Sequence, residues 1–174
     1  NYILQHIGAR TLDHTSHYKS IFSGVKISEI EQCLSDNEIN KILKECHDHI
    51  IRVWGVKDGE AGGTLKKFKK IKKGDSVIFI YDKGVIAVCD VLMTIEENSD
   101  FSMAIWNDSQ YQNIYFLNNF TEINYFAEGE SLLNKIKKIL YYKSGTNFQN
   151  LIIIDPDHDR HALLDVEMDI IRGK

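Results

Sequence analysis

Apolar residues in this chain follow two kinds of pattern. Short runs rich in Ile, Val and Tyr predict β-strands at 2–7, 50–54, 76–81, 85–91 and 151–154, with further short strands near 102–106, 113–117 and 121–126. Apolar residues three and four positions apart predict helices at about 35–47, 130–140 and 159–171. Ser35 and Glu38 fit a capping box that would begin the first of these helices.

The connections between these segments are rich in glycine and aspartate. Asp82-Lys83-Gly84 predicts a hairpin turn in which Gly84 supplies a positive φ. Residues 8–27 and the glycine-rich segment after Trp54 are expected to be loops, with Thr64 capping a short lysine-rich helix. Short strands in the middle and helices at both ends predict an α+β fold. We expect one domain over 1–174, with a curved antiparallel sheet or small barrel and helices packed on its outside.

Composition narrows the class of protein. The chain has 174 residues, of which 43% are hydrophobic and 26% charged, as in a globular domain. Its formal charge of −4 argues against coating nucleic acid by charge alone. Three cysteines without framework spacing, and no signal peptide, predict reduced thiols and a cytoplasmic location.

Common catalytic motifs do not occur in the sequence. It lacks the G-x-x-x-x-G-K-[ST] and G-x-G-x-x-G phosphate loops, the G-x-S-x-G nucleophile elbow, and the H-E-x-x-H and paired C-x-x-C zinc patterns. We therefore expect a domain that is not an enzyme and needs no cofactor or metal.

Six lysines in eight positions are the strongest local charge feature. They surround two apolar residues, Phe68 and Ile71. Such a patch can attract a phosphate backbone even on an acidic protein. It can equally be the solvated face of an amphipathic helix. The candidate phosphate-binding residues are Lys66, Lys67, Lys69, Lys70, Lys72 and Lys73.

Trp54 is the most informative aromatic residue. It ends an apolar strand and precedes a glycine-rich loop, so its ring could line a pocket and stack on a base, or fill the core. Core packing is the default for the other aromatic residues, which lie mostly on predicted strands and include Tyr81, Trp106, Tyr111, Tyr115 and Phe116.

Two clusters contain possible metal ligands. The run 155–161, followed by Asp165 and Glu167, is dense in carboxylates and histidines and could hold a divalent cation. It could also be a strand-to-helix connection in which aspartates cap the helix. Residues 46–49, Cys-His-Asp-His, are too close together to converge easily on one zinc ion, so a solvated helix end is favoured there.

The order of motifs along the chain adds a further expectation. Val53–Val56 reads W-G-V after its first residue, Lys73–Tyr81 contains G-D-x-V-x-F, and the strand Val85–Val91 carries small residues. With the opening strand Tyr2–His6, this order resembles the EVE branch of the PUA-like superfamily, to which the YTH readers of methylated adenine also belong. The resemblance covers residues 1 to about 126 and implies a small barrel with a pocket at one end.

The resemblance also implies roles for particular residues. In such readers a flipped base lies between aromatic walls, and Trp54 matches one wall. Gln5 and His6 match the polar residues that read the base edge. The second wall is left open among Trp106, Tyr115 and Phe120. The complete expected pocket comprises Gln5, His6, Trp54, Gly55, Val56, Tyr81 and Phe120.

EVE-like and YTH-like domains also occur at the N-terminus of McrB-type modification-dependent restriction proteins. The chain is similar to that arrangement, which implies a motor domain beyond Lys174 and a nuclease subunit as partners. The leading hypothesis is a DNA-binding module that recognises a modified, flipped base. The alternatives are an RNA-binding PUA-like module and a metal-dependent nuclease built on Asp155, Asp157, Asp159 and Glu167.

Overall fold

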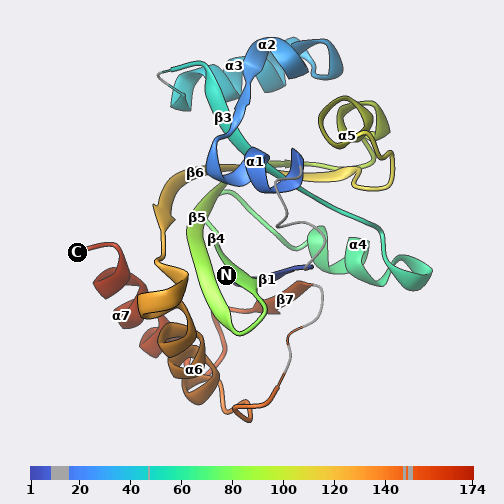
Figure 1. Ribbon diagram of the computed structural model, residues 1–174. Helices are drawn as coiled ribbons and strands as arrows, with labels where there is room; N and C mark the ends of the chain where they lie inside the picture. The colour runs from blue at the N-terminus through green and yellow to red at the C-terminus, as the bar shows by residue number, and fades with distance from the viewer. Residues whose placement is uncertain (9–15, 47, 147, 149–150) are drawn as a thin grey trace. The chain divides into compact units, whose positions relative to one another are not determined.

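The computed structural model describes residues 1–8, 16–46, 48–146, 148 and 151–174 (Figure 1). The chain divides into two compact units that alternate along the sequence. The first unit comprises residues 1–8, 75–89 and 119–174, and the second unit comprises 9–74 and 90–118.

Seven strands and their flanking helices make up the described residues. The strands are β1 (Tyr2–Ile7), β2 (Val25–Lys26), β3 (Ile50–Val56), β4 (Ser76–Tyr81), β5 (Gly84–Ile95), β6 (Asn113–Glu122) and β7 (Leu151–Ile154). The α-helices are α1 (Ser16–Phe22), α2 (Ile27–Ile30), α3 (Asp36–Glu45), α4 (Gly63–Phe68), α5 (Ser99–Trp106), α6 (Glu130–Ile139) and α7 (His161–Ile171). Short helical turns are η2 (Glu31–Cys33), η3 (Glu60–Gly62) and η4 (Tyr125–Gly129).

The strands form a curved sheet in the order β2-β3-β6-β5-β4-β1-β7 (Figure 1). This confirms the α+β class with flanking helices. In the described residues the sheet is open, with the two-residue β2 and the four-residue β7 at its edges, so the curved sheet is present and does not close into the small barrel that was the other expectation. The sheet is also mixed, because β1 pairs with β4 in parallel while β7 pairs with β1 antiparallel. A parallel pair needs a long crossover, and residues 8–75 supply one.

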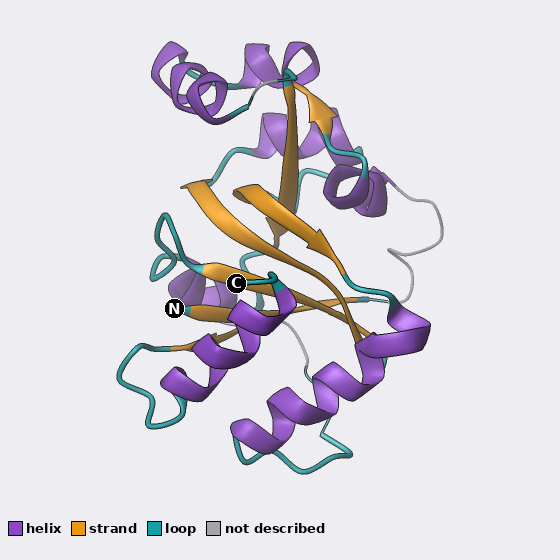
Figure 2. Cartoon of the chain, turned by 90° about the vertical axis from the view of Figure 1, so that its left-hand side faces the viewer, coloured by secondary structure: helices purple, strands orange, loops and turns teal. Residues whose placement is uncertain are grey.

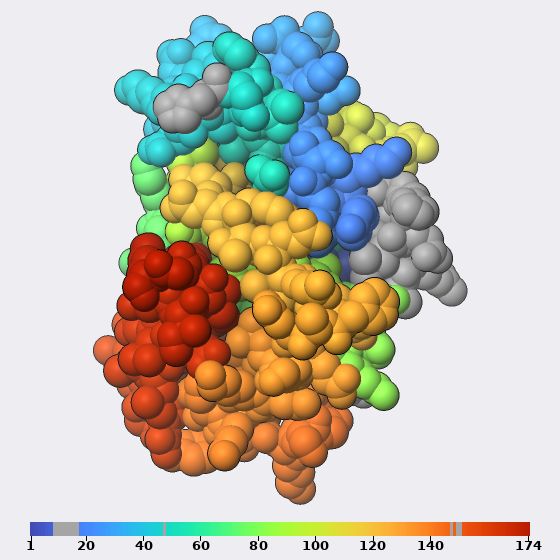
Figure 3. All heavy atoms as spheres, turned by 60° about the vertical axis from the view of Figure 1, so that its left-hand side comes forward, coloured from blue at the N-terminus to red at the C-terminus, as the bar shows by residue number. Residues whose placement is uncertain are grey.

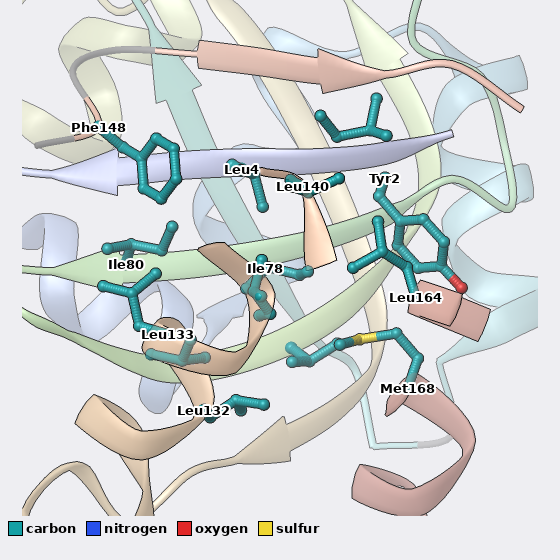
Figure 4. Close-up of a cluster of buried hydrophobic side chains, with 14 of the residues drawn as sticks. Tyr2, Leu4, Ile78, Ile80, Leu132, Leu133, Leu140, Phe148, Leu164 and Met168 are labelled. Carbon is teal, nitrogen blue, oxygen red and sulfur yellow. The ribbon is translucent and has the colours of Figure 1, made fainter. Parts of the chain in front are cut away.

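The core of the first unit lies between its strands and two helices. Leu4 on β1 and Ile78 on β4 are fully buried, and they belong to one cluster with Leu133 of α6 and Leu164 of α7 (Figure 4). Figures 1 and 2 show α6 and α7 as neighbouring helices. The α6 residues predicted to be buried confirm the helical spacing, with Leu132, Leu133, Ile136 and Leu140 in the cluster and Ile139 at its edge.

The core of the second unit is formed by β3 and β6 together with the helices around them. Ile51 and Val53 of β3 are buried against Phe101 of α5 and Phe116 of β6. The helix α3 begins as predicted. The Ser35 hydroxyl accepts a hydrogen bond from the Glu38 amide at 3.3 Å, and the Glu38 carboxylate accepts one from the Ser35 amide at 2.7 Å.

Some local predictions were wrong for identifiable reasons. The strand expected at 102–106 is the helix α5, which the Asn98 side chain caps by accepting the Phe101 amide at 3.0 Å. The expected loop at 8–27 contains α1 and β2, and its Asp13 and His14 lie outside the described residues. In the hairpin the positive φ belongs to Asp82, at 47°, and not to Gly84.

Two further predictions also differ from the structure. Thr64 does not cap the lysine-rich helix, because α4 already begins at Gly63. The strand predicted at 113–117 continues as β6 to Glu122, with Asn119 at a φ of 48°. The strand predicted at 121–126 was wrong beyond Glu122, because Tyr125 begins the helical turn η4. None of the helices in the described ranges has the length and hydropathy that a bilayer span requires.

Candidate nucleic-acid interface

Trp54 lies in β3 of the second unit, where it pairs with Tyr115 of β6. Its side chain is buried, with 4% of the residue exposed. Tyr115 is fully buried, and this burial raises the pKa of its hydroxyl. The next buried layer contains Phe68 of α4, whose ring centroid lies 5.1 Å from that of Tyr115. The second unit therefore connects the tryptophan strand to the lysine-rich segment through two aromatic rings.

The lysine-rich segment runs from α4 to Lys73 and confirms the predicted amphipathic pattern. Phe68 and Ile71 are buried, with 0% and 5% of each residue exposed. The six lysines of the run are all exposed. We refer to Lys66, Lys67, Lys69, Lys70, Lys72 and Lys73 as the lysine segment.

Acidic neighbours engage part of the lysine segment. Lys73 Nζ lies 2.9 Å from Glu45 Oε1, and Lys69 Nζ lies 3.4 Å from Glu96 Oε2. Within the described part of the chain, Lys66 and Lys70 form no ion pair. Exposed pairs of this kind contribute at most about 1 kcal/mol, so a phosphate can compete for them.

The loop between Trp54 and the lysine segment is held by polar contacts that the sequence analysis did not identify. Asn113 Nδ2 donates to Asp58 Oδ1 at 2.7 Å and to the Val56 carbonyl at 3.3 Å. The Asp58 carbonyl accepts hydrogen bonds from the Thr64 and Leu65 amides. These bonds tie the start of α4 to β3 and β6. A single buried asparagine in an apolar strand gives no sequence signal for this role.

Gly55 is needed for packing within the second unit. A Cβ at this position would lie 2.4 Å from Trp106 Cζ3 and 2.6 Å from the Tyr111 carbonyl oxygen. Trp106 itself is buried in the same unit, where its Nε1 donates to Ser20 Oγ at 3.3 Å. The W-G-V pattern therefore has a packing explanation in addition to the role that the family resemblance implies.

The predicted base-edge residues lie in the first unit. Gln5 is 4% exposed on β1 and donates from Nε2 to the His6 carbonyl at 3.1 Å. His6 is half-buried, and this burial lowers its pKa, an effect that the Asp82 carboxylate opposes. Tyr81, at the end of β4, is half-buried, and so is Phe120 of β6.

The expected base pocket thus takes residues from both units. Gln5, His6, Tyr81 and Phe120 belong to the first unit, and Trp54, Gly55 and Val56 to the second. Within the units, the structure brings together Gln5 with His6 on β1 and the three consecutive residues on β3. The complete pocket remains a prediction.

Two carboxylates that follow the acidic run 155–161 take part in structural contacts. Asp165 accepts a 2.5 Å hydrogen bond from the Tyr2 hydroxyl and lies 3.3 Å from His161 Nδ1. Glu167 forms a 2.6 Å ion pair with Lys135. Across the described residues, no three His, Cys, Asp or Glu side chains are grouped so that they could hold a metal ion. The Cys46–His49 cluster includes His47, which lies outside those residues.

The seven-stranded curved sheet and its flanking helices form an open, mixed α+β fold. No protein-family model and no curated protein matches the sequence. Among solved structures, the chain is similar to the N-terminal domain of McrB from Thermococcus gammatolerans, which was solved bound to m5C DNA. The TM-score is 0.65 at 18% sequence identity, over 97% of this chain and 98% of that one. At this identity the likeness establishes the shared fold.

Proposed function

We propose that this chain is a non-catalytic DNA-binding module that recognises a modified base. The observation that carries the proposal is the likeness of fold over nearly the whole length of both chains to a domain solved with m5C DNA. Fold alone does not determine function. The residues of this chain must therefore supply independent support, and the lysine segment does so.

The lysine segment has the chemistry of a phosphate-binding surface. Six ammonium groups lie within eight residues of a chain whose formal charge is −4. The segment is anchored by the buried Phe68 and Ile71, so the charges project from a packed surface. Each lysine that replaces a counterion on duplex DNA adds to affinity and to its salt dependence.

Phosphate contacts position a protein on DNA and do not identify a base. For that step we propose that Trp54 stacks on a flipped base while Gln5 and His6 hydrogen-bond to its edge. Stacking on an aromatic ring contributes about 1–3 kcal/mol per base, which can offset the cost of extruding one. Because Trp54 is 4% exposed, a base would have to replace contacts that its ring makes in the free protein.

The module would provide DNA specificity to a motor domain and a nuclease subunit, in the arrangement that the family resemblance implies. The nuclease alternative has less support, since Glu167 pairs with Lys135 and, among the described residues, no three His, Cys, Asp or Glu side chains are grouped to hold a metal ion. An RNA-binding PUA-like module uses the same fold and the same lysines, so only a binding experiment separates it from the DNA reader.

Fluorescence anisotropy provides that experiment. Labelled duplexes of one sequence would carry cytosine, 5-methylcytosine, N4-methylcytosine or N6-methyladenine at one position, beside a single-stranded RNA, at low and moderate salt. We expect at least one modified duplex to bind several-fold more tightly than its unmodified counterpart, because a buried methyl group adds under about 1 kcal/mol. The double variant Lys66→Gln with Lys70→Gln replaces the two lysines that form no ion pair in the described part of the chain. It should weaken binding to all duplexes alike.

Other results of the titrations would contradict the proposal or favour one of its alternatives. Equal affinity for every duplex would contradict recognition of a modified base. Tighter binding of RNA than of any duplex would favour the RNA-binding alternative, and cleavage that requires Mg²⁺ or Mn²⁺ would favour the nuclease. Lys138→Gln, at a surface lysine on α6, is the matched control and should leave affinity unchanged.

A further inference from the structure

Helix α7 of the first unit carries two apolar faces, and only one of them is covered. Leu164 and Met168 are buried in the first-unit core. Leu163, Val166 and Ile170 are 44%, 59% and 62% exposed. Because these three residues are spaced by three and four positions, they form one stripe along the helix, which we call the α7 stripe. The seven steps from Leu163 to Ile170 correspond to about 10.5 Å of helix.

A groove of about 440 Å³ borders the α7 stripe. Ile123 and Leu132 contribute apolar lining from the end of β6 and from α6, and Ile170 and Ile171 contribute it from α7. In Figure 3 the red side chains of α7 lie at the surface beside the orange side chains that follow β6. The groove therefore extends the apolar area of the stripe into a concave surface.

Carboxylates surround this apolar surface. Glu122 and Glu128 line the groove and are exposed. In the described part of the chain neither has an ion-pair partner. The one cation of the groove lining, Lys135, is neutralised by Glu167 at 2.6 Å. The groove thus combines apolar lining with two unbalanced carboxylates, Glu122 and Glu128, which we call its negative rim.

The apolar lining and the carboxylates together limit which kinds of molecule can bind in the groove. Its negative rim repels the phosphates of DNA, so the surface is separate from the proposed DNA-binding activity. A second copy in a two-fold contact would place the same patch against itself and so bring like carboxylates together. A helix with an apolar face and basic flanks satisfies both features at once.

We propose that the α7 stripe and its groove form a docking site for a basic amphipathic helix of a partner protein. Apolar residues of that helix, three and four positions apart, lie along Leu163, Val166 and Ile170 and enter the groove. Its lysines or arginines pair with Glu122 and Glu128. Exposed apolar area of this kind commonly marks a protein-interaction site. The proposal does not depend on DNA binding.

A synthetic helix tests the site directly. The probe is a labelled peptide of about 18 residues of leucine and lysine, with leucines spaced as on one face of a helix, and a second peptide replaces every lysine by glutamate. We expect the lysine peptide to bind and the glutamate peptide to bind at least about tenfold more weakly. Substituting Val166→Ser with Ile170→Ser, or Glu122→Lys with Glu128→Lys, should each weaken binding of the lysine peptide about tenfold.

Met103→Ser is the control, because Met103 is an exposed apolar residue of the second unit, at 48%, and should not alter peptide binding. Equal binding of both peptides, or binding that neither double variant weakens, would overturn the proposal. Sedimentation of the chain alone gives an independent check. Self-association that Val166→Ser with Ile170→Ser abolishes would show that a second copy covers the stripe, and would also overturn it. Either failure leaves the DNA titrations unaffected.

Discussion

The lysine segment and the α7 stripe are both surfaces of amphipathic elements, but they expose opposite chemistry. In the lysine segment the apolar residues Phe68 and Ile71 are buried and the cations project outward. In α7 one apolar set is buried, and a second set is exposed beside carboxylates. The first arrangement suits a polyanion, which is bound largely through charge. The second suits a protein partner, which is bound through apolar area with a polar rim.

The comparison predicts that the apolar side of the lysine segment stabilises the fold, whereas the α7 stripe does not. Phe68→Ala should lower the free energy of unfolding by about 3–5 kcal/mol, because it leaves a cavity against Tyr115. Ile170→Ser should change it by less than about 0.5 kcal/mol. Urea unfolding followed by circular dichroism measures both. A large loss of stability in Ile170→Ser would mean that the stripe belongs to the core.

The packing role of Gly55 gives the next largest effect. Gly55→Ala should destabilise the protein by about 1–3 kcal/mol, because its Cβ would meet Trp106 and the Tyr111 carbonyl. Gly63→Ala is the matched control, since its φ of −63° suits alanine and no atom lies within 4 Å of the added Cβ. The midpoint temperature of thermal unfolding should therefore fall for Gly55→Ala and stay unchanged or rise for Gly63→Ala.

The lysine segment should contribute to DNA affinity through counterion release. For Lys66→Gln with Lys70→Gln, we expect about tenfold weaker binding, or about 1.4 kcal/mol. The slope of log K against log salt should become less steep by about 1.8, which is about 0.9 for each phosphate that the variant no longer neutralises. Titrations over a series of NaCl concentrations measure the slope. An unchanged slope would remove the lysine segment from the interface.

The Tyr2 hydroxyl, which contacts Asp165 of α7, should make the stability of the protein depend on pH above about pH 10. Its hydroxyl donates to Asp165, and burial together with that carboxylate raises its pKa above the usual value of 10. Stability from this group is therefore complete below about pH 10 and is lost as pH rises further. Tyr2→Phe should lower the free energy of unfolding by about 1 kcal/mol at about pH 8. It should also reduce the loss of stability at higher pH, and the loss that remains should come in part from the buried Tyr115.

Urea titrations at a series of pH values from about 8 to about 11 measure this effect. Tyr141→Phe serves as the control, because Tyr141 is 65% exposed and its substitution should not alter the pH dependence. A Tyr2→Phe profile parallel to that of the parent protein would show that the Tyr2–Asp165 bond does not govern stability at high pH.

Much of the fold could be predicted from local signals. The capping box of Ser35 and Glu38 and the apolar spacing of α6 each specify a local structure with little help from the rest of the chain. The parallel pairing of β1 with β4 could not be predicted, because it joins segments about 70 residues apart. The helix α5 was missed because its aromatic residues favour strands, although Asn98 before it was a usable capping signal.

Of the candidate sites, the sequence likewise revealed the one that depends on a local pattern and missed those that depend on tertiary structure. The lysine segment was visible because charge and period coincide over eight residues. The α7 stripe was not recognised, because a helix with apolar residues on two faces looks like a fully buried one until exposure is known. The hydrogen bond of Asn113 to Asp58 depends on two strands meeting, and no single segment encodes it.

We propose that the chain recognises a base modification with one set of residues and binds the DNA backbone with another, the lysine segment. The most direct measurement is the ratio of Kd values for unmodified and modified duplexes, determined for the parent protein and for Lys66→Gln with Lys70→Gln. We predict a ratio several-fold above one that stays the same in the variant, while both affinities fall. A ratio of one in the parent protein, for every modification tested, would contradict the account.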